Sequence, residues 1–470
     1  MAGGPDGGGH PDGAGHPDGA DRPNGADRPN GPAAPDAART RLVDELRDRG
    51  RLTSRALEAA FRAVPRHVFL PEMAASQAYQ DEAFVIKTGE GGLPVSSSSQ
   101  PAIMAIMLEQ LGVARGHRVL EIGTGTGYNA ALLTHLVGPE GSVVTVDIDP
   151  DLAARARANL AAAGYPDVTV ICGDGGFGAL EHAPYDRIIV TAGASDLAPQ
   201  WLAQLGPGGR IALPLSLRGI QLCIALERSA GHWRSRSACR CGFIRMAGSL
   251  ASPEPYAPLG PQPGLHVQTD DGRGPDADAL YAALTGPYSD VPSGVRVAGL
   301  SELGETDLWV TVMEPGLARL TITGGGPLRG GVLPLLPFGM LASSDSGPGG
   351  GSGAVGGSGA VGGSGKVGGS GAAGLLPATP PSPGEHMYRK FEVAVRGFGP
   401  WGAGLAARLA DRVLAWQEFG RPRASALIVT AYPHEVPGQD APALPARPGQ
   451  AILDRPHTRL VLAWPPWPTS

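Results

Sequence analysis

Apolar and polar positions follow a regular pattern between Arg39 and Leu250. Short runs rich in Val, Ile and Leu alternate with segments in which apolar residues recur every three or four positions, so strands should alternate with helices. The predicted strands cover residues 117–123, 141–149, 168–174, 185–194 and 210–216, and the predicted helices cover 128–138, 150–164 and 199–206. Strands and helices in alternation form a parallel sheet covered on both faces. The pattern therefore predicts a doubly wound α/β region, preceded by helices over 41–50 and 54–71.

After Leu250 the pattern changes to short strands with a single long helix. The predicted strands cover 295–300, 307–313, 317–323, 390–399, 424–433 and 458–465, and the predicted helix covers 404–420. Few apolar residues are available to either half of this region by itself. We therefore expect residues 251–470 to form one smaller C-terminal α+β domain.

Two segments have too little apolar content to form a core. Residues 1–38 repeat Gly, Pro, Asp and Asn, which predicts a disordered tail. Residues 344–383 are dominated by Gly and Ser and predict a flexible linker that interrupts the C-terminal domain. The predicted organisation is thus a tail at 1–38, a main domain at 39–250 and the interrupted C-terminal domain.

Charge and cysteine content narrow the functional classes. Lys and Arg number 38 against 44 Asp and Glu, a formal net charge of −6, which argues against a nucleic-acid partner. The four cysteines are irregularly spaced, and Cys239 and Cys241 form a lone C-x-C pair, so we predict neither a disulfide framework nor a metal site. Without a long apolar stretch or a signal-like N-terminus, we expect a cytoplasmic protein without a membrane partner. The oligomeric state is not indicated.

A glycine-rich turn follows the first strand of the main domain. Gly123, Gly125 and Gly127 stand between that strand and a helix, where glycine allows a sharp turn and a close approach of backbone to ligand. The run from Gly125 to Ala130 also fits the dinucleotide pattern G-x-G-x-x-A, and Asp147 lies 20 residues beyond Gly127. The turn alone therefore predicts an adenosine-containing ligand and leaves NAD and S-adenosylmethionine open.

Acidic residues at successive strand ends favour S-adenosylmethionine. Glu121 completes the order E-x-G-x-G-x-G, which resembles motif I of S-adenosylmethionine-dependent methyltransferases. Asp147 ends the next strand and could accept the ribose hydroxyls, and Asp174 with Gly175 ends the third and could contact adenine. These ends meet at one edge of an open α/β sheet. A sulfonium cation suits such an acidic crevice better than an anionic pyrophosphate does.

Four serines, Ser96 to Ser99, precede a helix that starts near Pro101. Ser is a favoured N-cap and Pro suits the first helical turn, so Ser99 or its neighbour is predicted to cap this helix. That interpretation accounts for one hydroxyl and leaves the others unexplained.

The segment from Thr40 to Gly248 resembles the protein-L-isoaspartate O-methyltransferase family. The resemblance lies in "RHVFLP", "SSSQPAIMAIMLEQLG", "VLEIGTGTGYNAALL", "GDGGFG", "YDRIIVTAGA" and "QLGPGGRIALPL", in that order. It implies a Rossmann-like S-adenosylmethionine-dependent fold and methylation of an isoaspartyl carboxylate. The methyl ester would then close to a succinimide. In this family the serine that aligns with Ser99 contacts the substrate carboxylate.

The chain departs from the family pattern beside the serines, at "AFVIKTGEGG" and "GGLPVSS". Its C-terminal region is similar to extensions of family members encoded beside ribosomally made peptides, such as lanthipeptides and ATP-grasp peptides. That similarity implies an alternative substrate, an Asp of a dedicated precursor peptide. Two further alternatives stay open, an NAD-dependent oxidoreductase and a non-catalytic peptide-binding escort.

Overall fold

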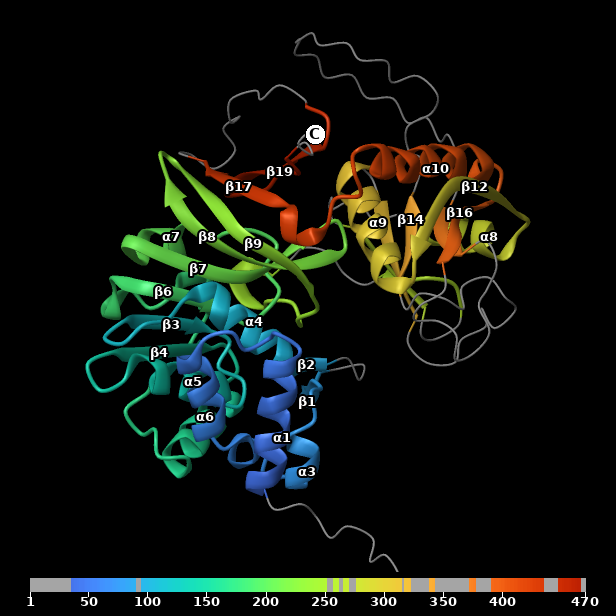
Figure 1. Ribbon diagram of the computed structural model, residues 1–470. Coiled ribbons are helices and arrows are strands. Elements are labelled where there is room, and N and C mark those ends of the chain that lie inside the picture. Colours follow the sequence, from blue (N-terminus) through green and yellow to red (C-terminus); the bar gives the residue numbers. More distant parts are fainter. Residues whose placement is uncertain are drawn as a thin grey trace, which may run out of the picture.

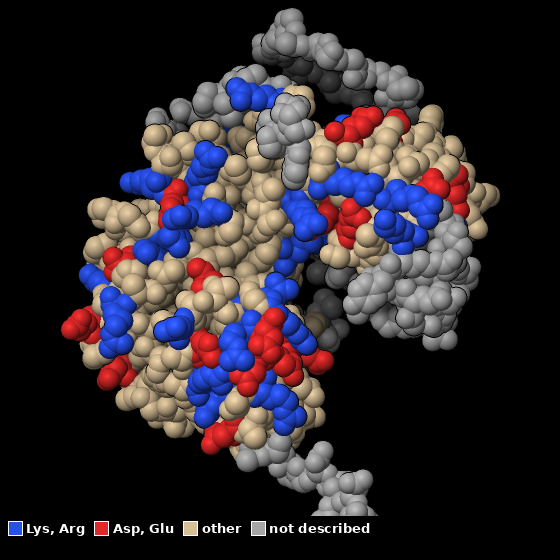
Figure 2. Space-filling view, in the orientation of Figure 1, with Lys and Arg blue, Asp and Glu red and all other residues tan. Residues whose placement is uncertain are grey.

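The structure is a computed structural model. It describes residues 35–89, 94–251, 257–261, 265–269, 276–314, 317–322, 338–342, 372–377, 390–434 and 447–465. In this part of the chain, no helix is both long and apolar enough to cross a membrane. Acidic and basic side chains are intermixed around α1 (Pro35–Asp48), as Figure 2 shows. Among the ion pairs of this region, Arg62 contacts Asp44 at 2.6 Å and Glu58 at 2.7 Å.

A ten-stranded sheet dominates the molecule (Figure 1). Its order is β18-β19-β17-β9-β8-β7-β6-β3-β4-β5. The five strands at one end pair in parallel: β3 (Arg118–Ile122), β4 (Ser142–Asp147), β5 (Thr169–Cys172), β6 (Tyr185–Val190) and β7 (Leu205–Leu217). β8 (Ile220–Ser229) and β9 (His232–Cys241) then add antiparallel strands. The predicted doubly wound α/β fold is confirmed.

Helices cover both faces of the parallel part. The helices of this region are α1, α2 (Arg55–Ala63), α3 (Ala75–Ala78), α4 (Pro101–Leu111), α5 (Tyr128–Val137), α6 (Pro150–Ala162) and α7 (Pro199–Gln204). On β4 the side chain of Val143 joins the core beneath α1, α2, α4 and α5, whereas Val144 joins the core on the opposite face, where Trp201 of α7 is buried. This alternation along one strand buries both faces of the sheet. The predicted helix over 54–71 ends at Ala63, because Pro65 cannot continue it, and resumes as a short 3₁₀ turn at Arg66–Phe69.

The N-terminal tail predicted for residues 1–38 is too long. α1 starts at Pro35, with Pro at the first helical position and Asp36 in the first turn, both favourable at a helix start. Ala38, Leu42, Val43 and Leu46 are buried on its inner face. Residues 1–34 lie outside the described part of the chain.

Beyond residue 251, the chain forms two small antiparallel sheets that are separate from the large sheet. One contains β10 (Ala257–Pro258), β11 (Leu265–Thr269), β13 (Leu317–Ile322) and β14 (Phe338–Ala342), and the other β12 (Tyr288–Ala298), β16 (Lys390–Phe398) and β15 (Ala372–Pro377). The helices are α8 (Ala277–Thr285), α9 (Leu300–Met313) and α10 (Gly402–Glu418). β15 falls within the linker predicted at 344–383. Residues 372–377 are therefore a strand paired antiparallel with β16 and not part of an irregular linker. Residues 343–371 and 378–389 lie outside the described residues.

The strand predicted over 307–313 is wrong. These residues form the C-terminal half of α9, where Leu308, Trp309, Val310, Thr311 and Val312 are all buried. A helix buried on every side carries a continuous apolar run, which periodicity cannot distinguish from a buried strand.

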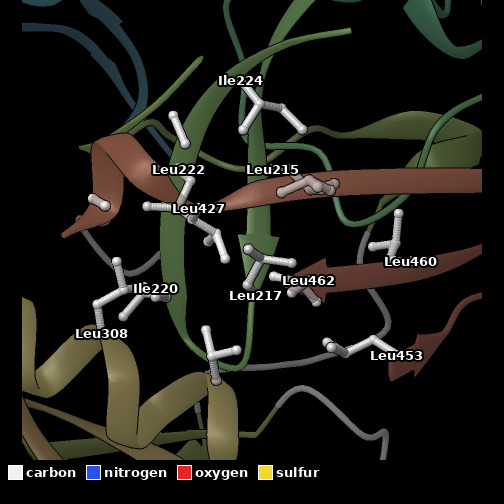
Figure 3. Close-up of a cluster of buried hydrophobic side chains, with 14 of the residues drawn as sticks. Leu215, Leu217, Ile220, Leu222, Ile224, Leu308, Leu427, Leu453, Leu460 and Leu462 are labelled. Atoms are coloured by element: carbon white, nitrogen blue, oxygen red, sulfur yellow. The ribbon is translucent and has the colours of Figure 1, made fainter. Parts of the chain in front are cut away.

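The C-terminal strands belong to the large sheet. β17 (Ile428–Pro433) pairs with β9 through Thr430 opposite Arg234, and β19 (Thr458–Ala463) and β18 (Gln450–Asp454) follow. Figure 3 shows Leu460 and Leu462 of β19 beside Leu215 and Leu217 of β7, with Leu308 of α9 near Ile220 of β8. The sheet thus continues across residue 250, so the predicted division there does not coincide with a break in the core.

Candidate active site

The glycine turn bends the chain sharply between β3 and α5. Gly123 has φ 98°, and a Cβ there would lie 2.6 Å from Thr191 Oγ1. Gly127 has φ 89°, and a Cβ there would lie 3.1 Å from Leu160 Cγ and 3.3 Å from the Ala156 carbonyl. Both positions therefore require glycine, the first for the approach of β6 and the second for the packing of α6.

A cavity of about 450 Å³ opens at the carboxyl edge of β3 and β4. Its walls are residues 87–89, the serine strand and its end at 95–99, the glycine turn at 121–126, the end of β4 at 146–149, Thr191 with Ala192, and residues 243–247 after β9. The size lies within the range of small-molecule sites. In the sheet, β4 and β5 lie on one side of β3, whereas β6 and β7 lie on the other, so the strand order reverses at β3. Open α/β sheets bind ligands at such a point.

Glu121 lies at the base of this cavity with 0% of its surface exposed. Its Oε1 accepts a hydrogen bond from Asn129 Nδ2 at 2.7 Å, and its Oε2 accepts one from Thr145 Oγ1 at 2.7 Å. Burial raises the pKa of Glu121 to about 7, although both donors oppose that rise. A cation placed in the cavity would favour the ionised carboxylate, so this group suits a positively charged ligand.

Asn129 offers a second contact for such a ligand. It lines the cavity, and its Oδ1 is buried without a hydrogen-bond partner among the residues that the structure describes. A buried acceptor without a partner costs free energy. An ammonium or amino donor of a bound molecule would remove that cost.

Asp147 closes the edge of the cavity at the end of β4. Its Oδ2 accepts from the Gly125 N–H at 2.9 Å and its Oδ1 from the Asp149 N–H at 3.0 Å. Burial raises its pKa above the ordinary value, opposed by these backbone donors. Each carboxylate oxygen has a second lone pair, so Asp147 can still accept hydroxyl donors from a ligand.

The glycine turn separates the two cofactor classes that the sequence left open. A pyrophosphate is bound by free N–H groups of such a turn. Here the Gly125 N–H donates to the Asp147 carboxylate, the Gly123 N–H to the Val146 carbonyl at 2.8 Å and the Gly127 N–H to the Thr124 carbonyl at 2.9 Å. With these donors occupied and two carboxylates alongside, the residues fit S-adenosylmethionine and disfavour NAD.

Of the remaining predicted residues, Gly175 lines the cavity, whereas Asp174 and Gly127 lie behind its wall. Gly175 lines the cavity, where a Cβ would lie 2.4 Å from Ile122 Cγ2. Asp174 is not among the lining residues. Its Oδ1 accepts from the Gly176 N–H at 2.8 Å and its Oδ2 from the Ser249 N–H at 2.7 Å. Gly127 likewise lies behind the wall, against α6.

The serine strand β2 (Pro94–Ser98) forms the wall that faces these acids, paired with β1 (Phe84–Thr88). Ser99 lines the cavity and is half-buried. The predicted serine cap of α4 is wrong. The N-cap residue is Gln100, without a side-chain bond, and the Ala102 N–H donates to Asp81 Oδ1 at 2.8 Å. A carboxylate from the turn after α3 thus occupies the place expected for a hydroxyl.

Arg66 holds this wall from behind and was missed by the sequence analysis. It is fully buried, and its Nη2 donates to the Ser99 carbonyl at 3.0 Å and to Ser98 Oγ at 3.4 Å. Its guanidinium also bonds the carbonyls of Gln80 at 3.1 Å and Glu82 at 3.2 Å. Burial lowers the pKa of Arg66 to about 10. The position of Ser99 therefore depends on this side chain.

Two further groups were not found from sequence. Lys87 of β1 lies in the cavity wall, and its Nζ bonds Asp149 at 2.6 Å and Asp151 at 2.9 Å, tying the β1–β2 hairpin to the start of α6. Residues 243–247 form another wall through the parallel bridge of Arg245 with Gly193. Neither belongs to a recognisable local motif, because each depends on chain segments brought together by the fold.

Comparison with known proteins shows similarity to one family. A sequence model described as protein-L-isoaspartate(D-aspartate) O-methyltransferase matches residues 37–251. The protein-L-isoaspartate O-methyltransferase of Methanopyrus kandleri is 41% identical over 220 residues, 46% of this chain and 95% of that protein. The one from Methanoculleus marisnigri is 43% identical over 206 residues, 44% of this chain and 89% of that protein.

A solved structure of a protein-L-isoaspartate O-methyltransferase matches with a TM-score of 0.44 and 22% identity, over 83% of this chain and 96% of its own. The two relatives are matched over 95% and 89% of their own length. The family model covers residues 37–251 and so contains the cavity residues from Lys87 to Ala247. The chain therefore belongs to the protein-L-isoaspartate O-methyltransferase family.

Proposed function

We propose that this chain is an S-adenosylmethionine-dependent O-methyltransferase that methylates the carboxylate of an isoaspartyl residue in a protein or peptide. The observation that carries the proposal is the meeting of two walls in one cavity. One wall contains Glu121 and Asp147, and the other contains Ser99. Membership in the family supports the same reaction.

The acidic wall binds the cofactor in this proposal. Glu121 and Asn129 attract its cationic end, and Asp147 accepts its ribose hydroxyls. Gly123, Gly125 and Gly175 keep the surface free of side chains. Gly127 and Asp174 act from behind the cavity by fixing α6 and the turn after β5.

The serine wall binds and orients the substrate. When bound, S-adenosylmethionine supplies a methyl group activated by a sulfonium. A carboxylate has an ordinary pKa of about 4 and is already ionised at neutral pH, so the chain needs no general base. Ser99 donates a hydrogen bond to one carboxylate oxygen and leaves the other free to react, and Arg66 fixes the Ser99 backbone. Alignment of the reacting atoms is then the main contribution of the site.

The test compares two peptides of one sequence, one with an isoaspartyl and one with an aspartyl residue. We expect a gain of one methyl group by mass spectrometry on the isoaspartyl peptide, followed by release of methanol. Ser99→Ala should lower kcat by about 100-fold with S-adenosylmethionine affinity retained, as expected for loss of a positioning hydrogen bond. Ser142→Ala, an exposed serine at the start of β4, is the matched control. Normal turnover of Ser99→Ala would refute the role of Ser99.

Three outcomes would redirect the proposal. Methylation of an Asp in one precursor peptide, with unrelated isoaspartyl peptides ignored, would assign the narrower function, tailoring of a ribosomally made peptide. The support for that version is the unusual hairpin that contains Lys87 and the C-terminal region beyond the family match. Cofactor binding without methylation of either peptide would indicate a peptide-binding escort. Preferential binding of NAD would refute the methyltransferase assignment.

A further inference from the structure

The C-terminal strands reach the active-site walls through one buried carboxylate, Asp196. This residue lies in the loop after β6, and 3% of its surface is exposed. Its Oδ2 accepts from the His457 N–H at 2.6 Å and its Oδ1 from Thr458 Oγ1 at 2.5 Å. The Leu197 N–H completes the set at 2.8 Å. Two of its three donors thus come from His457, in the turn between β18 and β19, and from Thr458, the first residue of β19, more than 250 residues away in sequence.

That turn is itself well anchored. The Arg455 N–H donates to the Thr458 carbonyl at 2.9 Å, and the His434 N–H donates to the His457 carbonyl at 2.9 Å. Arg455 Nη2 donates to the Ser216 carbonyl of β7 at 3.3 Å. Thr458 is fully buried. These hydrogen bonds hold His457 and Thr458, the two distant donors to Asp196, in place.

On the other side, Asp196 is three residues from Gly193, where two cavity walls join. The Gly193 N–H donates to the Ile244 carbonyl at 2.8 Å, and the Met246 N–H donates to the Gly193 carbonyl at 3.0 Å. Residues 243–247 form one wall of the cavity, and Thr191 with Ala192 forms another. A shift of the Asp196 loop would therefore move both walls.

Three hydrogen bonds offset the burial of Asp196, and an electrostatic interaction with His457 adds to them. Burial raises the pKa of Asp196, and Thr458, His457 and Leu197 oppose that rise. Removal of one donor leaves a buried carboxylate partly unsatisfied, which favours displacement of the loop towards solvent.

We infer that the turn at residues 455–458 is a positioning element of the active site, and that Asp196 transmits its position to the walls at 191–192 and 243–247. The inference rests on the proposed function for its catalytic consequence. The family match ends at residue 251, so this turn lies outside the part shared with the family. The C-terminal region is then a working part of the catalytic unit in this chain.

The test uses the full-length protein and three threonine variants. Thr458→Val removes the hydroxyl at nearly constant volume, and Thr458→Ser keeps it. Thr306→Val is the matched control, because Thr306 is equally buried but its hydroxyl bonds the Glu302 carbonyl within α9. Asp196→Asn is a second variant that weakens the same contacts from the other side.

The first readout is hydrogen exchange, which requires no activity. In Thr458→Val and Asp196→Asn we expect exchange of the Gly193 and Met246 amides to accelerate about tenfold or more, with the Val119 amide of β3 unchanged. Thr458→Ser and Thr306→Val should leave the Gly193 and Met246 amides as in the wild type. Equal acceleration at Val119 would indicate general destabilisation and would overturn the inference, as would unchanged exchange at Gly193 and Met246.

The second readout is kinetic. For the isoaspartyl peptide, kcat/KM should fall about tenfold in Thr458→Val and stay within about twofold in Thr458→Ser. Wild-type kinetics in Thr458→Val would overturn the inference. If the wild-type protein methylates no peptide, the proposed function fails, while the exchange measurement still decides whether the turn holds the walls.

Discussion

The ionisation of Glu121 gives a prediction with a defined size and sign. Burial raises its pKa to about 7 in the folded protein, against the ordinary 4.5 that applies to the unfolded chain. Below pH 4.5 the group is protonated in both states and has no effect on stability. Between pH 4.5 and 7 the unfolded chain ionises first, so the free energy of unfolding falls as the pH rises. At 1.36 kcal/mol for each pKa unit, the full loss is about 3 kcal/mol.

Glu121→Gln tests this value. The glutamine has nearly the same shape, can still accept from Asn129 and does not titrate. Urea unfolding of both proteins at pH 5, 6, 7 and 8 gives a difference in which the other titrating groups cancel. Relative to the wild type, the variant should gain about 2.5 kcal/mol between pH 5 and pH 8. A difference that stays constant with pH would show that Glu121 is not buried as the structure has it, and the cation-binding role would lose its basis.

Three other variants test the support of the site. Arg66→Met should raise the KM for the isoaspartyl peptide at least tenfold with cofactor affinity retained, because the Ser99 carbonyl loses its donor. Steady-state kinetics measure the KM, and calorimetric titration measures the cofactor affinity. An unchanged KM would contradict the supporting role of Arg66. Lys87→Met should accelerate amide exchange across β1 severalfold, because the contact with Asp149 ties the hairpin to α6. Equal exchange in variant and wild type would show that this contact does not stabilise the hairpin. Gly127→Ala should destabilise the protein by about 1 kcal/mol more than Gly50→Ala, since both residues have positive φ but only Gly127 meets α6 closely; equal losses in urea unfolding would refute the packing argument.

The parallel part of the sheet was predictable because each of its strands carries its own signal. The runs around Val143 and Ile188 are almost continuously apolar, as strands buried on both faces must be. The same property misled the prediction for residues 307–313, since a helix enclosed on all sides shows the same continuous run. Local pattern reports burial more directly than it reports secondary structure.

The candidate site was predictable where its residues lie at or just after the ends of successive strands. Glu121, Gly123, Gly125 and Asp147 follow one another at strand ends, and the structure brings them to one cavity. Asp174 belongs to the same series but supports the wall from outside, because two backbone N–H groups engage its oxygens. Whether a strand-end carboxylate faces the ligand or caps a neighbouring turn depends on backbone geometry that spacing does not report.

The residues that support the site from a distance could not be found in this way. In the sequence Arg66 is one more charged residue just after a helix, and only the fold shows the four acceptors around its guanidinium. The contact of Asp196 with Thr458 joins segments far apart in sequence, and no periodicity relates them. Such contacts are properties of the folded chain, so a single sequence does not reveal them.

The central claim is that the acidic wall and the serine wall of one cavity bring a cofactor methyl group and a peptide carboxylate together. A crystal structure with S-adenosylhomocysteine and an isoaspartyl peptide tests it most directly. We predict the homocysteine ligand between Glu121 and Asp147, and the isoaspartyl carboxylate hydrogen-bonded to the Ser99 hydroxyl and facing the sulfur. A ligand bound outside this cavity, or a Ser99 hydroxyl turned away from the carboxylate, would contradict the claim.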